Sequence, residues 1–184
     1  MKKLLLTAVA ALCLPAAAIA QEAPDGTPAY GIEPYFGIGG GYHDFDRGNR
    51  GALQWNNGKA ASGALVTAFA GVNFPVKFLV VGVEGNVAKG FSDIDWEYGV
   101  TGHIGIRAGD SGMFFVRGGY HWVEGDKGFR NDKNEIYGFG VEVGPKDIGL
   151  GGITGNAGVR LRLAVDTFDE FQSIRPTAAL VFHF

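Results

Sequence analysis

Polar and apolar residues alternate with a period of two from Trp96 to Ala108, and this pattern constrains the fold more than any other feature of the sequence. Even positions carry Trp, Tyr, Val, Gly, Ile, Ile and Ala, whereas odd positions carry Glu, Gly, Thr, His, Gly and Arg. Successive side chains of a β-strand point to opposite faces. The stretch therefore predicts a strand with one apolar face and one face that holds every charge.

The same alternation recurs in seven further segments, at 35–42, 63–74, 79–87, 114–122, 137–144, 158–166 and 177–184, with the first two showing it more weakly. Eight segments of about ten residues match the length of tilted strands that cross a bilayer. Glycine makes up 31 of 184 residues and is interleaved with valine and aromatic residues, which favours β structure with closely spaced backbones. The expected fold class is all-β, a closed antiparallel transmembrane barrel of about eight strands.

The charged parity is assigned to the barrel interior. It is also the glycine-rich parity, and it contains both signs of charge, as the crowded interior of a narrow barrel requires. An arginine facing lipid near the midplane costs about 2–4 kcal/mol, so a one-residue slip that exposed several arginines would cost on the order of 10 kcal/mol. The predicted lumenal polar network comprises Glu84, Glu97, His103, Arg107, Arg117, His121, Glu142, Arg160 and Arg162.

The apolar parity is assigned to the lipid. Its large aromatic residues lie toward strand ends, in the pattern of the two interfacial girdles: Trp96, Tyr98, Tyr120, Trp122, Tyr137, Phe139, Phe182 and Phe184. A soluble lipocalin-like binding barrel is the alternative with the two faces exchanged. It would expose many aligned Val, Ile, Leu and Phe side chains to water, which makes it the weaker interpretation.

An even number of strands places both termini on the periplasmic side. The expected outer loops are 43–62, 89–95, 124–134 and 167–173, and the expected short periplasmic turns are 75–77 and 110–112. The third periplasmic connection, 145–155, is too long for this scheme. It either holds a short irregular segment or moves a strand boundary, so the strand count depends on it.

The first 20 residues have the composition of a secretory signal peptide. Lys2 and Lys3 precede an apolar run that ends at Pro15, and Ala18-Ile19-Ala20 forms an A-x-A cleavage site. The alternative is an anchor helix, for which the apolar run is short. The expected domains are a signal peptide at 1–20, cleaved after Ala20, a short periplasmic segment at 21–31 and the barrel at 32–184.

Removal of the signal peptide leaves a mildly acidic chain without thiols. The only cysteine, Cys13, lies in the signal peptide, so the mature chain has no disulfide and no cysteine ligand or nucleophile. Subtracting Lys2 and Lys3 from 16 basic residues leaves 14 against 19 acidic ones, a net charge of −5. This balance argues against a nucleic-acid partner.

No catalytic, cofactor or metal site is expected. The four histidines, His43, His103, His121 and His183, lack metal-ligand spacing, and none of the serines Ser62, Ser92, Ser111 and Ser173 is a near sequence neighbour of a histidine. The acids Asp44, Asp46, Asp93 and Asp95 are expected in outer loops, either as solvated side chains or as ligands of a divalent cation.

Three short stretches resemble the small outer-membrane barrels of the opacity, OmpA and OmpX types. They are Gly82-Val83-Glu84, Gly140-Val141-Glu142 and the closing Ala178 to Phe184. The resemblance implies the outer membrane of a Gram-negative bacterium. It also implies that Phe182 and Phe184 form the C-terminal signal that the barrel assembly machinery reads, and that periplasmic chaperones, outer-membrane lipids and lipopolysaccharide are partners.

These observations predict a monomeric, non-enzymatic outer-membrane protein with a structural role in the envelope and a lumen plugged by side chains. The alternative is a surface adhesin or host-interaction or resistance factor that acts through its outer loops. Its best candidate contact is the first outer loop, with Phe45, Arg47, Arg50, Trp55 and Lys59. A narrow ion path and a lipid A-modifying enzyme are weaker alternatives, and the sequence names no ligand or host partner.

Overall fold

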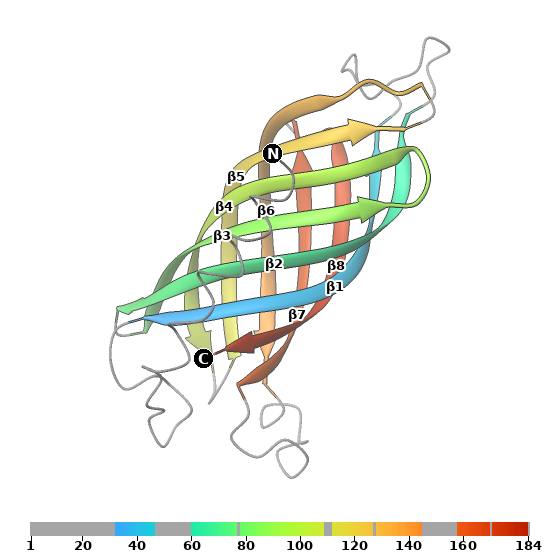
Figure 1. Cartoon of the computed structure of the whole chain (residues 1–184). Helices are drawn as coiled ribbons and strands as arrows, with labels where there is room; N and C mark the ends of the chain where they lie inside the picture. Colours follow the sequence, from blue (N-terminus) through green and yellow to red (C-terminus); the bar gives the residue numbers. More distant parts are fainter. Residues whose placement is uncertain are drawn as a thin grey trace, which may run out of the picture.

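The protein forms a closed barrel of eight antiparallel strands (Figure 1). The computed structural model describes residues 32–46, 60–76, 78–108, 112–126, 128–144, 158–169 and 171–183. The strands are β1 (Glu33–Phe45), β2 (Ser62–Val76), β3 (Leu79–Gly90), β4 (Ile94–Ala108), β5 (Gly112–Gly125), β6 (Asp132–Val143), β7 (Val159–Phe168) and β8 (Ser173–His183). Each predicted segment forms one strand, so the predicted fold class and strand count are confirmed.

Every strand pairs with its neighbours in sequence, and β1 pairs with β8 to close the barrel. In the closing pair Ile38 lies opposite Leu180, and Phe45 lies opposite Ser173. Closure leaves no free sheet edge, as strands in a membrane require. We call the end where β1 starts and β8 finishes the terminal end, and the opposite end the loop end. In the described part of the chain, no helix is long and apolar enough to cross a membrane.

The two parities face opposite sides of the barrel wall, as the alternation predicts. In β4, Val100 is 58% exposed and Ile104 is 54% exposed, whereas Glu97 and Thr101 are buried. The same division holds in the other strands, where Val83, Val116 and the remaining apolar residues of this parity point outward. The outer surface of the barrel wall is therefore apolar, and the charged residues of the strands lie in its interior.

The interior is filled by side chains along its whole length. An apolar group, which we call the loop-end cluster, comprises Phe45, Ala61, Leu65, Ala88, Ile94, Val123, Phe129 and Phe168. Smaller apolar groups lie further inside, Tyr35 with Phe69, Ala179 and Val181, and Val80 with Met113, Phe115 and Ala164. Charged side chains occupy the space among these groups.

The strands extend further toward the loop end than the sequence predicted. Only residues 91–93 separate β3 from β4, and only residues 169–172 separate β7 from β8. The expected outer loops at 89–95 and 167–173 were therefore too long, and His43 lies in β1 rather than in a loop. Backbone groups beyond the apolar band still need partners, so pairing continues past the residues at which the predicted strands ended.

Several expectations fall outside the described residues. They are the signal peptide at 1–20, the segment at 21–31, most of the first outer loop at 47–59, the connection at 145–155 and Phe184. β6 ends at Val143 and β7 begins at Val159, which leaves room for that connection without changing the strand count.

Candidate functional site

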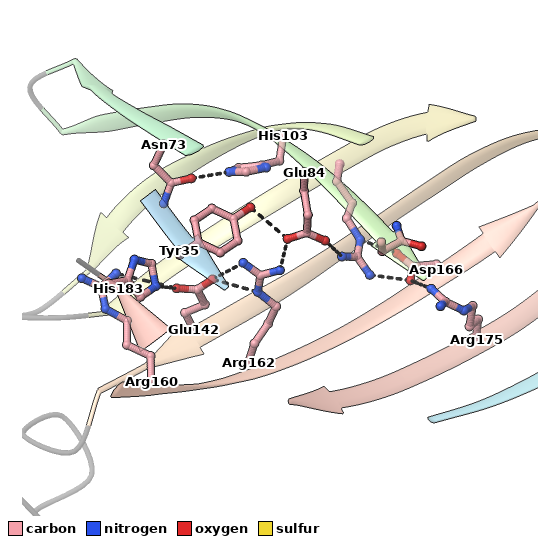
Figure 2. A network of polar contacts seen from close by, with 12 residues as sticks. Tyr35, Asn73, Glu84, His103, Glu142, Arg160, Arg162, Asp166, Arg175 and His183 are labelled. Carbon is pink, nitrogen blue, oxygen red and sulfur yellow. Dashed lines mark hydrogen bonds and ion pairs between the residues drawn. The ribbon is translucent and has the colours of Figure 1, made fainter. Parts of the chain in front are cut away.

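The structure places the nine predicted lumenal side chains inside the barrel. Seven of them are buried, and the side chains of Arg107 and Arg117 are 13% and 10% exposed. Most belong to one continuous series of contacts between charged groups, which runs along the interior (Figure 2). We call this series the ion-pair chain and describe it from the terminal end to the loop end.

The ion-pair chain begins around Glu142 of β6. The register of β6 and β7 places Glu142 directly opposite Arg162. Arg162 donates from Nε to Glu142 Oε1 at 2.8 Å, and its Nη2 lies 2.6 Å from the same oxygen. The other oxygen, Oε2, lies 3.7 Å from Arg160 Nη1 and 3.0 Å from His183 Nε2. One carboxylate therefore joins three basic side chains from β7 and β8.

Arg162 connects this first group to Glu84 of β3. Its Nη1 donates to Glu84 Oε2, which also accepts a hydrogen bond of 2.9 Å from the hydroxyl of Tyr35. The other Glu84 oxygen lies 3.4 Å from Arg117 Nη1. The Arg162 guanidinium also lies 4.5 Å from the ring centroid of Phe69, a cation–π contact. Arg162 therefore contacts two carboxylates, those of Glu84 and Glu142, and the aromatic ring of Phe69.

The ion-pair chain continues through Asp166 to the loop end. Arg117 donates from Nε and Nη2 to the two oxygens of Asp166, at 2.7 and 2.6 Å. Arg175 Nη1 donates to Asp166 Oδ2 at 3.2 Å, and Arg175 Nε lies 3.0 Å from Glu97 Oε2. Glu97 Oε1 lies 2.5 Å from Nδ1 of His43. Acidic and basic groups therefore alternate from one half of the barrel to the other.

His43 continues the series into a serine. Its Nε2 lies 2.9 Å from Ser173 Oγ, and Ser173 Oγ accepts a hydrogen bond of 3.0 Å from the backbone N–H of Phe168. The sequence analysis set serine chemistry aside because no serine lies near a histidine in the sequence. The inference that no serine lies close to a histidine was wrong. Barrel closure pairs β1 with β8 and places His43 beside Ser173, although the two residues are 130 positions apart in the sequence.

A separate polar group occupies the terminal end. Arg107 pairs with Glu33, and Glu33 Oε2 accepts a hydrogen bond of 3.3 Å from the amide of Asn73. The Asn73 carbonyl oxygen lies 2.8 Å from Nε2 of His103 (Figure 2). Predicted lumenal residues Arg107 and His103 are thus joined through Glu33 and Asn73, which the prediction omitted.

Glycine creates the space that this interior needs. His121 contacts the amide nitrogen of Asn86 at 3.0 Å and lies across from Gly99, where an added Cβ would be 2.0 Å from the imidazole ring. A Cβ at Gly138 would lie 2.0 Å from Oδ1 of Asp166. Both distances are far below van der Waals contact, so these polar residues fit only because the neighbouring position lacks a side chain.

Eight lumenal residues in these contacts were not among the nine predicted: Glu33, Tyr35, His43, Asn73, Asp166, Ser173, Arg175 and His183. Each of these residues lies on the inward-facing parity of its strand. Some of them lie beyond the positions at which the sequence predicted the strand to end. Continuing the alternation to the last residue before each loop would have found Glu33, His43 and Arg175.

Charge within the barrel is balanced. Among the described lumenal residues, five arginines contact five carboxylates: Arg107, Arg117, Arg160, Arg162 and Arg175, with Glu33, Glu84, Glu97, Glu142 and Asp166. Burying an unpaired charge costs several kcal/mol, so this pairing is a condition for the fold. In the same part of the chain, no group of three or more His, Cys, Asp or Glu side chains is arranged to hold a metal ion.

The acids expected in the outer loops have different environments. Asp44 and Asp46 are exposed, Asp95 pairs with Lys89, and Asp93 is buried and accepts a hydrogen bond of 3.3 Å from the backbone N–H of Ser62. They do not converge on a shared centre, so the structure does not bring the expected cation ligands together.

Aromatic side chains near strand ends contact one another on the outer surface. Tyr98 stacks on Trp122 with ring centroids 5.7 Å apart, and the ammonium of Lys89 lies 5.0 Å from the ring centroid of Trp96. At the terminal end, Phe182 stacks on Phe36 across the β1–β8 pair, with centroids 4.9 Å apart. This half-buried stack gives Phe182 a structural role in barrel closure.

Comparison with known proteins shows the fold. No protein-family model and no curated protein sequence matches the chain. Neisserial surface protein A is similar in structure, with a TM-score of 0.50 and 10% identity over 84% of this chain and 97% of that protein. Ail, the attachment invasion locus protein of Yersinia pestis, solved in complex with the heparin analogue sucrose octasulfate, gives 0.51 and 14% identity over 84% of this chain and 100% of that protein. The chain has the fold of the small eight-stranded outer-membrane β-barrels.

Proposed function

We propose that the protein is an integral outer-membrane barrel that contributes to the mechanical integrity of the cell envelope, with a lumen sealed by its own side chains. The ion-pair chain is the observation that carries this proposal. It links side chains from seven of the eight strands, all except β2, and its contacts cross the barrel interior rather than following one strand pair. Such cross-bracing stiffens the barrel and occupies the route that a solute would take.

The interior of an eight-stranded barrel is just wide enough for its own side chains. Here the loop-end cluster fills the mouth of the barrel, and charged residues fill the middle. A diffusion pore for nutrients needs an open aqueous lumen, which larger barrels have. We therefore assign the protein to envelope structure rather than to solute uptake.

The location and the partners follow from this proposal. The signal peptide would direct export with cleavage after Ala20, and the mature barrel would reside in the outer membrane as a monomer. Lipids and lipopolysaccharide would contact its apolar surface. The barrel assembly machinery would recognise the C-terminal strand with Phe182 and Phe184, after periplasmic chaperones had delivered the chain.

Deletion of the gene tests the envelope role. The deletion strain should become sensitive to detergents and to large antibiotics that an intact outer membrane excludes, and the wild-type gene should restore resistance. Purified protein in planar bilayers should show no steady conductance. Unchanged sensitivity of the deletion strain, or a stable open channel, contradicts the proposal.

A second candidate function is adhesion to a host surface through the first outer loop. The likeness to Ail, an attachment invasion locus protein solved with a heparin analogue, favours this candidate. Four of the expected contact residues, Arg47, Arg50, Trp55 and Lys59, lie outside the described residues. Phe45 was wrongly included, because its side chain is buried in the loop-end cluster.

Replacing residues 47–59 with glycine and serine separates the two candidates. Loss of binding to heparin-coated beads, with the heat-dependent shift in gel mobility preserved, would support adhesion. The same replacement should leave detergent resistance unchanged if the barrel alone supports the envelope. Loss of detergent resistance with normal barrel assembly would instead assign the envelope role to the loop.

A further inference from the structure

Ser173, His43 and Glu97 form a directed series of hydrogen bonds near the loop end. Nδ1 of His43 lies 2.5 Å from Glu97 Oε1, and Nε2 of His43 lies 2.9 Å from Ser173 Oγ. The three residues come from β1, β4 and β8, so only the closed barrel brings them together. Arg175 already pairs with Glu97, so charge balance within the barrel accounts for neither His43 nor Ser173 at this place.

The donors and acceptors fix the direction of these bonds. The Glu97 carboxylate only accepts, so Nδ1 of His43 carries the proton and donates. In the form of His43 that carries a proton on Nδ1 alone, Nε2 accepts a hydrogen bond from the hydroxyl of Ser173. The backbone N–H of Phe168 donates to Ser173 Oγ, which leaves the serine proton free to point at His43. This is the order that a serine nucleophile, a general base and an orienting carboxylate require.

The surroundings of the three residues suit this chemistry. Ser173 is 7% exposed, His43 is 1% exposed and Glu97 is fully buried, so the serine lies nearest the surface. The ring of Phe45 stacks on His43 with centroids 4.0 Å apart, and Phe168 packs edge-on against the imidazole at 6.3 Å. Arg175, 3.0 Å from the second oxygen of Glu97, keeps that carboxylate ionised and in place. Phe45 and Phe168 belong to the loop-end cluster, so a substrate would have to displace these rings to reach Ser173, and such apolar neighbours favour an uncharged ester with an apolar acyl group.

We propose that Ser173 is an activated nucleophile for acyl esters, with His43 as its general base and Glu97 as the residue that orients His43. Ser173 Oγ attacks the ester carbonyl carbon while its proton passes to Nε2 of His43. The bond from carbon to the alcohol oxygen breaks, and that oxygen takes the proton from His43, which leaves an acyl-serine. A water molecule then attacks the acyl carbon, gives a proton to His43 and releases the carboxylic acid, while the proton returns to Ser173. The net reaction is ester plus water giving acid plus alcohol.

An alkyl fluorophosphonate tests this proposal on the full-length folded barrel in detergent. Ser173 Oγ would displace fluoride from phosphorus, and the serine proton would leave with the fluoride through His43. Peptide mass spectrometry should find the adduct on Ser173 and not on Ser62 or Ser92, which serve as controls within the same molecule. A colorimetric butyrate ester should be hydrolysed by the same preparation and not after labelling.

Three variants separate activation from ordinary serine reactivity. Ser173→Ala should abolish the adduct, His43→Gln should slow labelling at Ser173, and Glu97→Gln should slow it by about 10³–10⁴-fold because the imidazole tautomer is no longer fixed. Heat-dependent gel mobility identifies the variants that remain folded. Absence of an adduct on the folded wild-type protein overturns the proposal, and so does labelling that is equal at Ser173, Ser62 and Ser92 or unchanged in folded Glu97→Gln. None of these labelling results bears on the envelope role, which the deletion strain tests separately.

Discussion

At the scale of single residues, Arg162 is the most connected member of the ion-pair chain. It contacts Glu84, Glu142 and the aromatic rings of Tyr35 and Phe69. Removing one partner of a buried ion pair is costly because the remaining charge is left without compensation. The carboxylates of Glu84 and Glu142 would both lose their principal partner if this guanidinium were absent.

The Arg162→Ala substitution should therefore lower the free energy of unfolding by about 3–5 kcal/mol. Urea unfolding in lipid vesicles, followed by tryptophan fluorescence, measures the change. Arg130→Ala is the matched control, since Arg130 is exposed in the β5–β6 connection, and it should change stability by less than about 0.5 kcal/mol. Equal stability of the two variants would mean that the interior charges do not support the fold.

At the scale of elements, the strands were predictable where the alternation is complete and imprecise where it fades. β4 and β5 were found because, within 96–108 and 114–122, every charged side chain lies on one face. The loop end of β1 was missed because the successive residues His43 and Asp44 are both polar. In β8, Ser173, Ile174 and Arg175 continue the alternation, which the prediction began only at Thr177. Which lumenal residues touch one another was not predictable, because the contact between His43 and Ser173 depends on the stagger with which the sheet closes.

Glycines on the inner face set how closely neighbouring strands approach. A Cβ at Gly119 would lie 2.1 Å from the backbone oxygen of Val100, on the neighbouring strand, whereas a Cβ at Gly85 would meet no atom within 4 Å. Backbone atoms cannot move aside as a flexible side chain can. Gly119 tests the packing of β4 against β5, and Gly85, exposed on the outer face of β3, is the control.

The Gly119→Ala substitution should destabilise the barrel by about 1–3 kcal/mol through overpacking, and Gly85→Ala should leave stability nearly unchanged. The urea concentration at the midpoint of unfolding in vesicles measures both effects. If both variants unfolded at the wild-type midpoint, the close approach of β4 and β5 at Gly119 would not be a constraint on the fold.

At the scale of the whole molecule, one assignment organises every other conclusion. The apolar parity faces lipid, and the charged parity is enclosed, where five arginines and five carboxylates pair among the described residues. Sequence alone predicted this assignment because a slip of one residue would expose arginines to lipid at a cost on the order of 10 kcal/mol. The envelope role, the sealed lumen and the reactive serine all require a barrel with these two faces.

Spin-label accessibility along β4 tests this assignment most directly. The mature chain as predicted has no cysteine, so single cysteines at positions 98 to 106 can each carry one label without a background signal. In lipid vesicles, labels at Tyr98, Val100 and Ile104 should collide with oxygen dissolved in the bilayer, and labels at Thr101 and His103 should be protected from it. Uniform accessibility along the strand, or the opposite alternation, would contradict the account.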